Sequence, residues 1–384
     1  MNKQLAILGG GQLGRMLQQA AIPYPCDLHF LDAVKSPIGQ VSPFLHQGDF
    51  RQKKDVLNFC NEIKPQTLSI EIEDVSIEAL FHISEKGEIN ILPNPQHLAT
   101  IKDKGLQKQL YEKLQLPTAA FELYQDKAEV KKALQTGQLQ YPFVQKLRTG
   151  GYDGKGVQII KNASGMAKCF DAPCLVEVLA DIDKELAITI LRDKQGHTAH
   201  YPIAEMVFNE NANLVEYVLA PARINANQTK RIQEIAHKLV DDWNYMGILA
   251  IELFLNKDGS IWINEVAPRT HNSGHWTIEA CHSSQFDQQI RLMMDLPLGS
   301  TAMKVPYAAM INLLGAHDTE KGQAHYHHID KAYEMPGAQV HLYGKQEVRP
   351  YRKMGHISLL DDQLDRLLEN AAYLFDSIKI NNHE

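Results

Sequence analysis

The sequence predicts a mixed α/β and α+β fold, with a parallel α/β domain first, an α+β domain in the middle and a small antiparallel β domain last. Three observations support this prediction. A strand, a glycine-rich turn and a helix follow one another over residues 5–20. Glycine-containing turns join β-branched strands within residues 143–160 and 249–265. Short strands then follow residue 308.

The composition is that of a globular protein and argues against several functions. A chain of 384 residues is long enough for two or three domains, and 44% hydrophobic with 22% charged residues is ordinary. The net charge of −7 argues against bulk nucleic-acid binding. Five cysteines without a CxxC pair favour a reducing cytoplasm. We expect neither a signal peptide nor a membrane span, because no apolar run approaches about 18 residues.

The N-terminal segment carries a glycine-rich turn between a strand and a helix. The apolar run at residues 5–8 precedes the turn at residues 9–14, and a second strand ends at Asp32. The turn has the GxGxxG spacing of Rossmann-like dinucleotide sites, which carry an acidic residue farther on. A glycine-rich turn at a helix N-terminus can equally hold another phosphate or only allow close packing. We predict a Rossmann-like domain whether the turn binds a dinucleotide, binds another phosphate or only allows close packing.

Two acidic residues follow in the same domain. A strand over residues 67–75 would place Glu71 and Glu73 on the same side, since side chains alternate along a strand. A binding role competes here with simple solvation of the two carboxylates. The sequence Pro-Asn-Pro at residues 93–95 interrupts regular structure and ends the first domain.

A helix over residues 102–114 opens the second domain, and a glycine-rich loop follows between two strands of residues 143–160. Four glycines stand within residues 150–156, and backbone N–H groups in such a loop can approach phosphate oxygens closely. The loop is not a Walker loop, because GxxxxGK[ST] is absent from the chain. A phosphate-covering loop and a plain hairpin turn are the two interpretations.

Two glutamates face each other on a predicted hairpin over residues 249–265. If Asp258-Gly259 is a two-residue turn, counting outward sets Glu252 opposite Glu265. Opposed side chains lie about 4.5–5.5 Å apart at Cβ, so two carboxylates there repel each other. Magnesium takes one or two protein carboxylates together with water and phosphate oxygens, and would resolve the conflict. The alternative is a pair of solvated glutamates, and a longer loop would shift the register.

Two further segments concentrate charge. Residues 264–276, NEVAPRTHNSGHW, bring a carboxylate, an arginine, a histidine and an asparagine together at a strand end, which we interpret as a site for a charged ligand. Residues 344–356 carry four cations, namely Lys345, Arg349, Arg352 and Lys353. Such cations can clamp a phosphate, although charge clusters are commonly solvated loops.

Six motifs in chain order resemble the ATP-grasp superfamily and, within it, the family of 5-(carboxyamino)imidazole ribonucleotide synthases. They are GGGQLGRM, IEIEDV, TGGYDGKG, INEVAPRTHNSGHW, MINLLG and RPYRKMGH. The resemblance implies a Rossmann-like domain over residues 1–98, an ATP-grasp domain over residues 99–298 with a glycine-loop lid near residues 117–180, and a small antiparallel β domain over residues 299–384.

The implied reaction is ATP-dependent carboxylation of 5-aminoimidazole ribonucleotide by bicarbonate, through carboxyphosphate. It gives 5-carboxyaminoimidazole ribonucleotide, ADP and phosphate in purine biosynthesis. The implied cofactors are ATP and Mg²⁺, the implied metal ligands are Glu252 and Glu265, and the implied assembly is a cytoplasmic homodimer. The glycine turn at residues 9–14 is then reassigned from a dinucleotide to the ribonucleotide substrate.

The resemblance also implies roles for individual residues. Those that would contact ATP are Lys104, Lys146, Gly151, Tyr152, Asp153, Gly154, Lys155, Gly156, Val157, Glu177, Val178, Leu179, Ala180, Glu185, Phe208, Asn264 and Glu265. Those around the ribonucleotide would be Gln12, Leu13, Glu73, Lys345, Arg352 and Lys353. The catalytic set would be Arg269, His271 and Asn272 around bicarbonate, with Tyr152 and Asp153 also facing the ribonucleotide.

Some features depart from this pattern, and three other functions compete with it. Asp74 stands where asparagine is expected, Phe208 where a histidine often lies near the nucleotide, and Tyr351 where glycine is usual. A superfamily relative could phosphorylate formate and act on glycinamide ribonucleotide, but HNSGHW argues against it. An NAD-dependent oxidoreductase is supported only by the first glycine turn and Asp32. A nucleotide-binding protein without activity is the third alternative.

Overall fold

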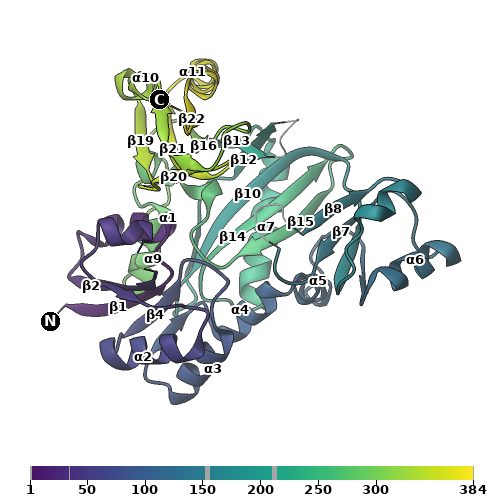
Figure 1. Cartoon of the computed structure of the whole chain (residues 1–384), viewed down its shortest axis with the longest axis horizontal. Helices are drawn as coiled ribbons and strands as arrows, with labels where there is room; N and C mark the ends of the chain where they lie inside the picture. Colours follow the sequence, from purple (N-terminus) through teal and green to yellow (C-terminus); the bar gives the residue numbers. More distant parts are fainter. Residues whose placement is uncertain (1, 34, 152–155, 210–213, 384) are drawn as a thin grey trace.

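The computed structural model describes residues 2–33, 35–151, 156–209 and 214–383, and Figure 1 shows their arrangement. An N-terminal α/β lobe, coloured purple, lies on one side of a long central sheet. A small sheet with helix α6 (Lys127–Thr136) lies beyond the other end. The C-terminal strands, in green and yellow, continue the central sheet above the N-terminal lobe. The central sheet therefore connects the other parts of the molecule.

The N-terminal sheet is parallel and has the strand order β3-β2-β1-β4-β5. Its strands are β1 (Lys3–Leu8), β2 (Cys26–Asp32), β3 (Leu45–Gln47), β4 (Thr67–Ile70) and β5 (Asn90–Leu92). Side chains alternate along β1, so Leu5 and Ile7 enter one core while Ala6 and Leu8 enter another. Burial on both faces explains the unbroken apolar run of this strand. The predicted Rossmann-like arrangement is confirmed.

Helices cover both faces of this sheet, and one of them comes from far along the chain. They are α1 (Gln12–Ala21), α2 (Lys53–Ile63), α3 (Ile77–Lys86), α4 (Pro95–Lys102) and α9 (Gln285–Met294). Apolar residues of α1 and α9 share a core with β1 and β2, whereas those of α2, α3 and α4 pack on the opposite face. Figure 1 shows α9 beside α1. The N-terminal lobe is therefore completed by a helix that lies in sequence between strands β15 and β16 of the central sheet.

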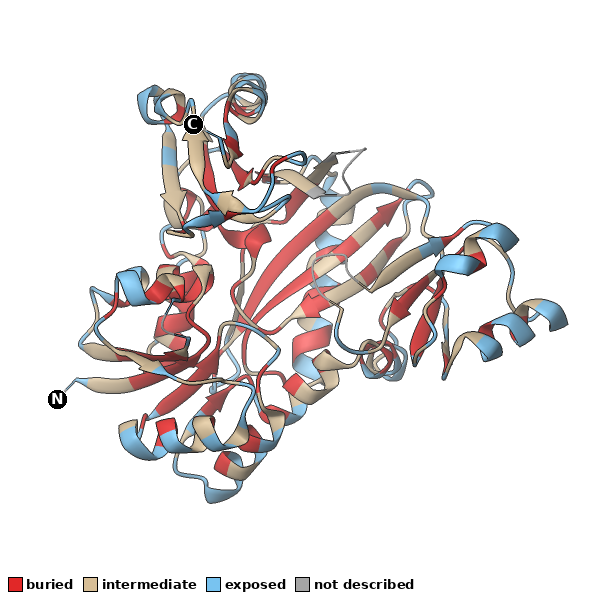
Figure 2. Ribbon diagram, in the orientation of Figure 1, coloured by how far each residue is buried: buried red, intermediate tan, exposed pale blue. Residues whose placement is uncertain are grey.

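The central sheet is antiparallel and includes the C-terminal strands. Its order is β15-β14-β10-β12-β13-β16-β21-β19, with β11 paired to β10. The strands are β10 (Ile182–Arg192), β11 (Thr198–His200), β12 (Ala204–Asn209), β13 (Leu214–Ala220), β14 (Gly247–Asn256), β15 (Ile261–Ala267), β16 (Tyr307–Leu314), β19 (Ala338–Leu342) and β21 (Lys353–Asp361). The predicted antiparallel C-terminal strands are present, and pairing of β13 with β16 makes them continuous with the rest. Figure 2 shows that much of β10 and β14 is buried.

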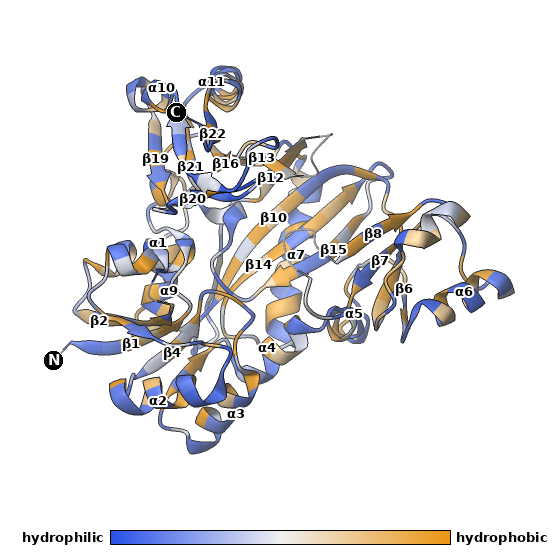
Figure 3. Ribbon diagram, in the orientation of Figure 1, coloured by the Kyte–Doolittle hydropathy of each residue, from blue (hydrophilic) through white to orange (hydrophobic). Residues whose placement is uncertain are grey.

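Helices and a second antiparallel sheet complete the fold. Helix α7 (Ala226–Asp242) packs its apolar side on the central sheet. Its apolar residues recur at positions 232, 235, 236, 239 and 240, a one-sided spacing that predicts such packing. Helix α11 (Leu364–Ser377) packs on the C-terminal strands. The second sheet has the order β6-β9-β7-β8. Its strands are β6 (Phe121–Tyr124), β7 (Phe143–Leu147), β8 (Val157–Ile160) and β9 (Cys174–Val178). Figure 3 contrasts the apolar strands of the central sheet with the hydrophilic outer helices.

Short elements fill the connections. They are α5 (Lys104–Lys113), α8 (Thr277–Ala280), α10 (Asp330–Glu334), β17 (Gly322–Gln323), β18 (His325–His327), β20 (Glu347–Val348), β22 (Lys379–Asn381), and 3-10 turns at Pro37–Gln40, Ala163–Lys168 and Asn272–Gly274. None of the helices in the described ranges has both the length and the apolarity to cross a bilayer.

The predicted helix over residues 102–114 is interrupted at Asp103, which is a correction to the sequence-based limits. Helix α4 ends before this residue and α5 begins after it. The Asp103 carboxylate accepts the backbone N–H of Gly105 at 2.8 Å, a contact typical of a strong N-cap. Lys104 is therefore the first residue of α5 rather than an interior one.

Candidate active site

Glu252 and Glu265 face each other on the β14–β15 hairpin, as predicted, but for a different reason. The strands pair near the turn one residue out of the register that a two-residue turn requires, so the predicted turn at Asp258-Gly259 is wrong. A β-bulge next to Glu252 corrects the offset and leaves Asn264 as the extra residue. Bulges re-aim side chains and are common beside active sites. Here the bulge restores the opposition of the two carboxylates.

The two facing carboxylates have different electrostatic surroundings. Burial, and next the nearby carboxylates of Glu265 and Glu185, raise the pKa of Glu252. Burial acts in the same direction on Glu265, but an ion pair with Lys104 outweighs it and lowers the pKa of Glu265. The Nε2 atom of His271 lies 3.6 Å from Oε1 of Glu252. Glu265 is therefore easily ionised, whereas Glu252 needs a nearby cation to stabilise its ionised form.

A buried ion cluster joins the second sheet to α5 and β15. Glu177 of β9 lies between two ammonium groups, with Oε1 2.5 Å from Lys108 Nζ and Oε2 2.7 Å from Lys146 Nζ. Lys146 also donates to Asn264 Oδ1 at 2.9 Å. Burial lowers the pKa of Lys108 to about 8, against the opposing effect of the Glu177 carboxylate. The predicted ATP ligands Lys146, Glu177 and Asn264 are therefore brought together, with Lys108 as an additional member.

The described end of the glycine-rich loop, at residues 156–157, lies beside this cluster. Val157 begins β8 and pairs with Lys146 of β7, so the end of the loop meets a predicted ATP ligand. Gly156 has a φ of +86°, a conformation that favours glycine. Gly151 is half-buried at the other end of the loop. The predicted contacts of Tyr152, Asp153, Gly154 and Lys155 lie outside the described residues.

The remaining residues assigned to ATP lie on neighbouring strands. Glu185 stands on β10, where burial raises its pKa to about 7. Val178 ends β9 and is 53% exposed, and Leu179 and Ala180 connect β9 to β10. Phe208, on β12, packs its ring against a core that includes Trp276 and Met206. An apolar ring at this position contributes packing, whereas a histidine would have offered a polar contact.

The loop after Pro268 connects the hairpin to both other domains. Arg269 Nε lies 2.9 Å from Oε1 of Glu73, which follows β4 of the N-terminal lobe. Asn272 exchanges two hydrogen bonds of 2.9 and 3.2 Å with Asn312 of β16. His271 lies between these residues in the chain. The predicted bicarbonate residues are therefore attached to the N-terminal lobe on one side and to the C-terminal strands on the other.

The first glycine-rich turn is filled by carboxylates of the protein itself. Gly10 N–H donates to Asp32 Oδ2 at 2.7 Å, and Gly14 N–H donates to Glu71 Oε2 at 2.8 Å. The predicted strand over residues 67–75 is too long, because β4 ends at residue 70 and Glu71 turns beneath the helix start. Burial raises the pKa of Glu71 to about 7. Carboxylates thus take the place of a dinucleotide pyrophosphate at this helix N-terminus, which argues against the oxidoreductase alternative.

The basic C-terminal loop meets the first glycine-rich turn. Lys345 Nζ donates to Gln12 Oε1 at 2.8 Å and to the backbone carbonyl of Lys353 at 2.6 Å. Arg352 donates to a backbone carbonyl of the same loop at 2.6 Å. Tyr351 has a φ of +61°, which explains why glycine is favoured there. Residues assigned to the substrate phosphate and to the ribonucleotide thus lie side by side, although they come from opposite ends of the chain.

Comparison with known proteins agrees with this geometry. Three family models match in order, the ribonucleotide synthetase preATP-grasp domain at residues 1–102, the ATP-grasp domain at residues 109–286 and the phosphoribosylaminoimidazole carboxylase C-terminal domain at residues 308–370. The N5-carboxyaminoimidazole ribonucleotide synthase of Synechococcus elongatus is 35% identical over 371 residues, which cover 93% of this chain and 89% of the relative. The chain belongs to the N5-carboxyaminoimidazole ribonucleotide synthase family.

Solved structures of this family have the same fold. The synthetase of Thermotoga maritima superposes with a TM-score of 0.90 at 35% identity, covering 99% of this chain and 100% of that one. The synthase of Aspergillus clavatus, in complex with ADP and 5-aminoimidazole ribonucleotide, has a TM-score of 0.86 at 30% identity, covering 98% of each chain. The predicted family, fold and class of ATP-grasp ligase are confirmed.

Lys108 belongs to the buried ion cluster with Glu177 and Lys146, and sequence reasoning missed it. It follows Lys104 by four residues and precedes the fully buried Tyr111 by three, so it lies on the inner side of α5. Lysine is rarely buried without a partner, and this spacing is the signal that could have found it. Its partner Glu177 is far away in sequence, which is why the pairing was not predicted.

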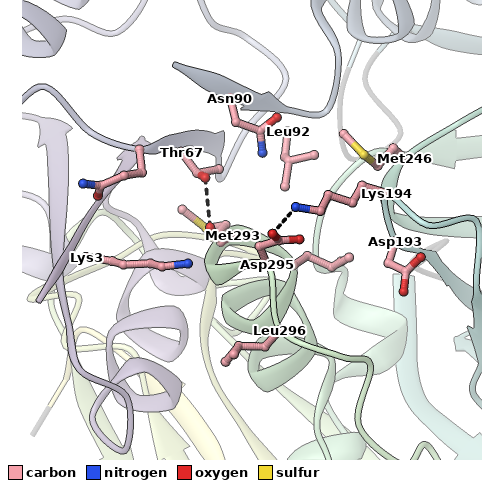
Figure 4. A pocket seen from close by; sticks show the side chains of 12 residues that line it. Lys3, Thr67, Asn90, Leu92, Asp193, Lys194, Met246, Met293, Asp295 and Leu296 are labelled. Atoms are coloured by element: carbon pink, nitrogen blue, oxygen red, sulfur yellow. Dashed lines mark hydrogen bonds and ion pairs between the residues drawn. The ribbon is translucent and has the colours of Figure 1, made fainter. Parts of the chain in front are cut away.

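A cavity of about 400 Å³ lies apart from the residues assigned to ligands in this family, and Figure 4 shows its lining. It lies where the N-terminal ends of β1, β4 and β5 approach the end of α9. Within it Lys194 pairs with Asp295, and Thr67 Oγ1 donates to the backbone carbonyl of Met293 at 2.8 Å. These contacts bind the N-terminal lobe to the central domain.

Proposed function

We propose that this chain carboxylates 5-aminoimidazole ribonucleotide with bicarbonate at the expense of ATP, giving N5-carboxyaminoimidazole ribonucleotide, ADP and phosphate. The observation that carries the proposal is the ion pair of Arg269 with Glu73. It brings the loop that follows the glutamate hairpin against the N-terminal lobe, where the residues assigned to the ribonucleotide lie. The Aspergillus clavatus relative, solved with ADP and 5-aminoimidazole ribonucleotide, supports the same pair of ligands.

ATP would bind between the second sheet and the central sheet. We assign the phosphates to Lys104 and Lys146, the ribose to Glu185, and the adenine to the strand connection over residues 178–180. The Glu177 carboxylate is paired with Lys108 and Lys146. We therefore assign Glu177 the role of positioning Lys146 rather than of contacting the nucleotide. The loop over residues 151–157 would close over the phosphates and exclude water.

Magnesium fits the glutamate hairpin. Among the described residues no group of three or more His, Cys, Asp or Glu could hold a metal alone, but Mg²⁺ usually takes one or two carboxylates and completes its shell with phosphate oxygens and water. Glu252 and Glu265 supply such a pair. When bound, the ion would offset charge on the phosphoryl oxygens. Once Lys104 turns from Glu265 to the phosphates, the two carboxylates need another cation, which supports this assignment.

The ribonucleotide would lie between the N-terminal lobe and the basic loop. Gln12 and Glu73 would hydrogen-bond the substrate, and Leu13, whose side chain is buried, would act through its backbone. Its phosphate would bind Lys345, Arg352 and Lys353, of which Lys345 donates to Gln12 and to the backbone carbonyl of Lys353. In this arrangement the exocyclic amine would face Arg269.

The chemistry joins the two halves of the site. A bicarbonate oxygen attacks the γ-phosphorus of ATP, the bond to the β-phosphate oxygen breaks, and ADP leaves with carboxyphosphate formed. The exocyclic amine of the imidazole then attacks the carboxyl carbon, or the CO2 it releases, and phosphate departs while the amine loses a proton. Arg269, His271 and Asn272 would hold the bicarbonate in line for the first step. Their positive and polar groups stabilise the charge that develops.

Domain limits and assembly complete the proposal. We propose the divisions at residues 98 and 298, a lid near residues 117–180, and a cytoplasmic homodimer. All five cysteines are free, which fits a reducing compartment. Light scattering measures the mass of the particle, and a mass close to one chain would contradict the dimer.

The proposed reaction is tested by measuring ADP formation with ATP and Mg²⁺ while 5-aminoimidazole ribonucleotide and bicarbonate are omitted in turn. We expect ADP to form rapidly only when both are present. Replacement of bicarbonate by formate, with glycinamide ribonucleotide as acceptor, should give no ADP. ADP formation that is indifferent to both substrates would contradict the proposal.

A further inference from the structure

Gln285, the first residue of helix α9, reaches back to the loop that contains Arg269 and His271. Its side chain is completely buried. The carboxamide bonds both backbone groups of His271, because His271 N–H donates to Oε1 at 2.9 Å and Nε2 donates to the His271 carbonyl at 2.7 Å. The side chain therefore acts as a neighbouring strand would, and it fixes the backbone of one loop residue from two sides.

A second contact fixes the orientation of this carboxamide. Nε2 of Gln285 lies 3.1 Å from Nδ1 of His275, which is also completely buried. Because Nε2 is the donor, Nδ1 accepts and the imidazole is neutral, in line with a pKa that burial holds well below its usual value. A Cβ at Gly274 would lie 2.6 Å from Oε1 of Gln285. The loop is thus packed around the carboxamide so closely that glycine is required.

The same helix is bonded to the N-terminal lobe. Gln289, one turn after Gln285, donates from Nε2 to Ser69 Oγ of β4 at 2.9 Å. Near the end of the helix, Thr67 Oγ1 donates to the Met293 carbonyl at 2.8 Å. Strand β4 ends just before Glu71, and the chain then delivers Glu73 to Arg269. Helix α9 therefore connects the strand that leads to Glu73 with the loop that carries Arg269.

We propose that Gln285 is a positioning residue for carboxylation. Through the backbone of His271 it holds Arg269, His271 and Asn272 in register with Glu73, so that bicarbonate and the acceptor amine meet. The role rests on the proposed function, since it takes this loop as the bicarbonate subsite. Gln285 touches no reacting atom, and its effect on the reaction is transmitted by the loop.

The test compares Gln285→Met with Gln288→Met, a matched control on the same helix. Gln288 is also completely buried, and its carboxamide also bonds both backbone groups of one residue, Gly299, at 2.7 and 3.0 Å. Gly299 lies in the connection to the C-terminal strands, away from the loop. Both substitutions remove a pair of hydrogen bonds to one backbone residue, and Gln285→Met also removes the contact with His275, so it should lower the melting temperature at least as much as Gln288→Met.

The kinetic constants should differ. For Gln285→Met we expect kcat/KM for bicarbonate to fall about 10- to 100-fold, the usual cost of misplacing a group by about 1 Å, while KM for ATP changes by less than about threefold. ADP should also form in excess over carboxylated product. Gln288→Met should leave all three quantities near those of the unchanged chain. Equal kinetic losses in the two variants, or equal losses for ATP and bicarbonate, would overturn the role.

A second variant guards against misfolding of the first. Gln285→Glu has nearly the same shape and retains the acceptor for His271 N–H, but it sets an oxygen against the His271 carbonyl. We expect the same selective loss in kcat/KM for bicarbonate, and an unchanged kcat/KM for bicarbonate in this folded variant would overturn the role. If the unsubstituted chain forms ADP equally well without bicarbonate, the proposed function itself is contradicted. Bicarbonate-dependent turnover with Gln285→Met matching Gln288→Met refutes only the role of Gln285.

Discussion

Two groups of charged pairs border the proposed ATP site, and they differ in their exposure to solvent. The buried cluster consists of Lys108, Glu177 and Lys146, whose side chains are 3%, 4% and 10% exposed. The open pairs join the hairpin to α5 and to the loop, and the loop to the N-terminal lobe. Their side chains are 19% to 42% exposed, and the pairs are Lys104 with Glu265, His271 with Glu252, and Arg269 with Glu73.

The difference separates structural charges from charges that ligands can reach. Breaking a buried pair leaves an uncompensated charge in the interior and is costly, so the buried cluster should persist when ATP binds. An exposed pair contributes little to stability because water solvates both partners well. The open pairs can therefore exchange partners with phosphate, bicarbonate or a metal ion at low cost. Every catalytic residue that we propose in the described loop belongs to the open group or lies beside it.

The largest expected effect compares stability across the two groups. Glu177→Gln removes the anion between two buried ammonium groups, and should lower the free energy of unfolding by about 3–5 kcal/mol. Glu73→Gln breaks an open pair and should lower it by no more than about 1 kcal/mol. Urea denaturation measures both. Similar losses of unfolding free energy in the two variants would contradict the distinction between buried and open pairs.

The second prediction separates bicarbonate from ATP within the open group. Arg269→Ala removes a cation that stabilises charge developing on bicarbonate, and turnover should fall by about 10²–10³-fold, as when one such donor is lost from other active sites. The dissociation constant for ATP should stay within about threefold, because Arg269 is not assigned to the nucleotide. Steady-state kinetics and equilibrium binding of ATP give the two values. An equal loss of ATP affinity would contradict the assignment.

The smallest effect concerns the pH dependence of the buried cluster. The pKa of Lys108 is about 8 in the folded chain, below that of an exposed lysine, so its amine loses its charge as the pH rises through 8. Glu177 then has only Lys146 as a charged partner. Its carboxylate holds the Lys146 ammonium group more strongly, so Lys146 binds the phosphates of ATP less well. KM for ATP should rise about 3- to 10-fold from pH 7 to pH 9, the effect of roughly 1 kcal/mol in one charge interaction.

Arginine keeps its charge throughout this range. In Lys108→Arg the rise in KM should therefore be absent, and a rise that persists would show that another group titrates. Stability changes with pH in the opposite direction. Since the folded pKa of Lys108 is lowered, its contribution to stability is present above the pKa of the unfolded chain and is lost as the pH falls through 8.

Local patterns allowed much of the fold to be predicted, because they reflect the immediate neighbours of each residue. The apolar run of β1 and the one-sided spacing of α7 were sufficient for their elements. The predicted limits were wrong where a side chain inside the pattern binds the backbone and interrupts the helix, as when Asp103 caps α5. The continuity of β16 with β13 likewise depends on pairing between distant segments, which no local pattern contains.

The site was predictable only in part, for related reasons. Glu252 and Glu265 were found by counting from a turn, but the bulge at Asn264 has no residue signature and the count succeeded only because the bulge cancels the error in the turn. Lys108 was missed because its partner comes from β9. Gln285 was missed because a glutamine that bonds a backbone cannot be told in sequence from a glutamine in solvent.

The central claim is that ATP phosphorylates bicarbonate at the loop after Pro268. Turnover with bicarbonate labelled with ¹⁸O tests it most directly, because the oxygen that attacks the γ-phosphorus stays with phosphate whether carboxyphosphate or CO2 meets the amine. We predict one ¹⁸O atom in the phosphate for each molecule of ribonucleotide carboxylated. Phosphate that carries oxygen from water instead would contradict the account.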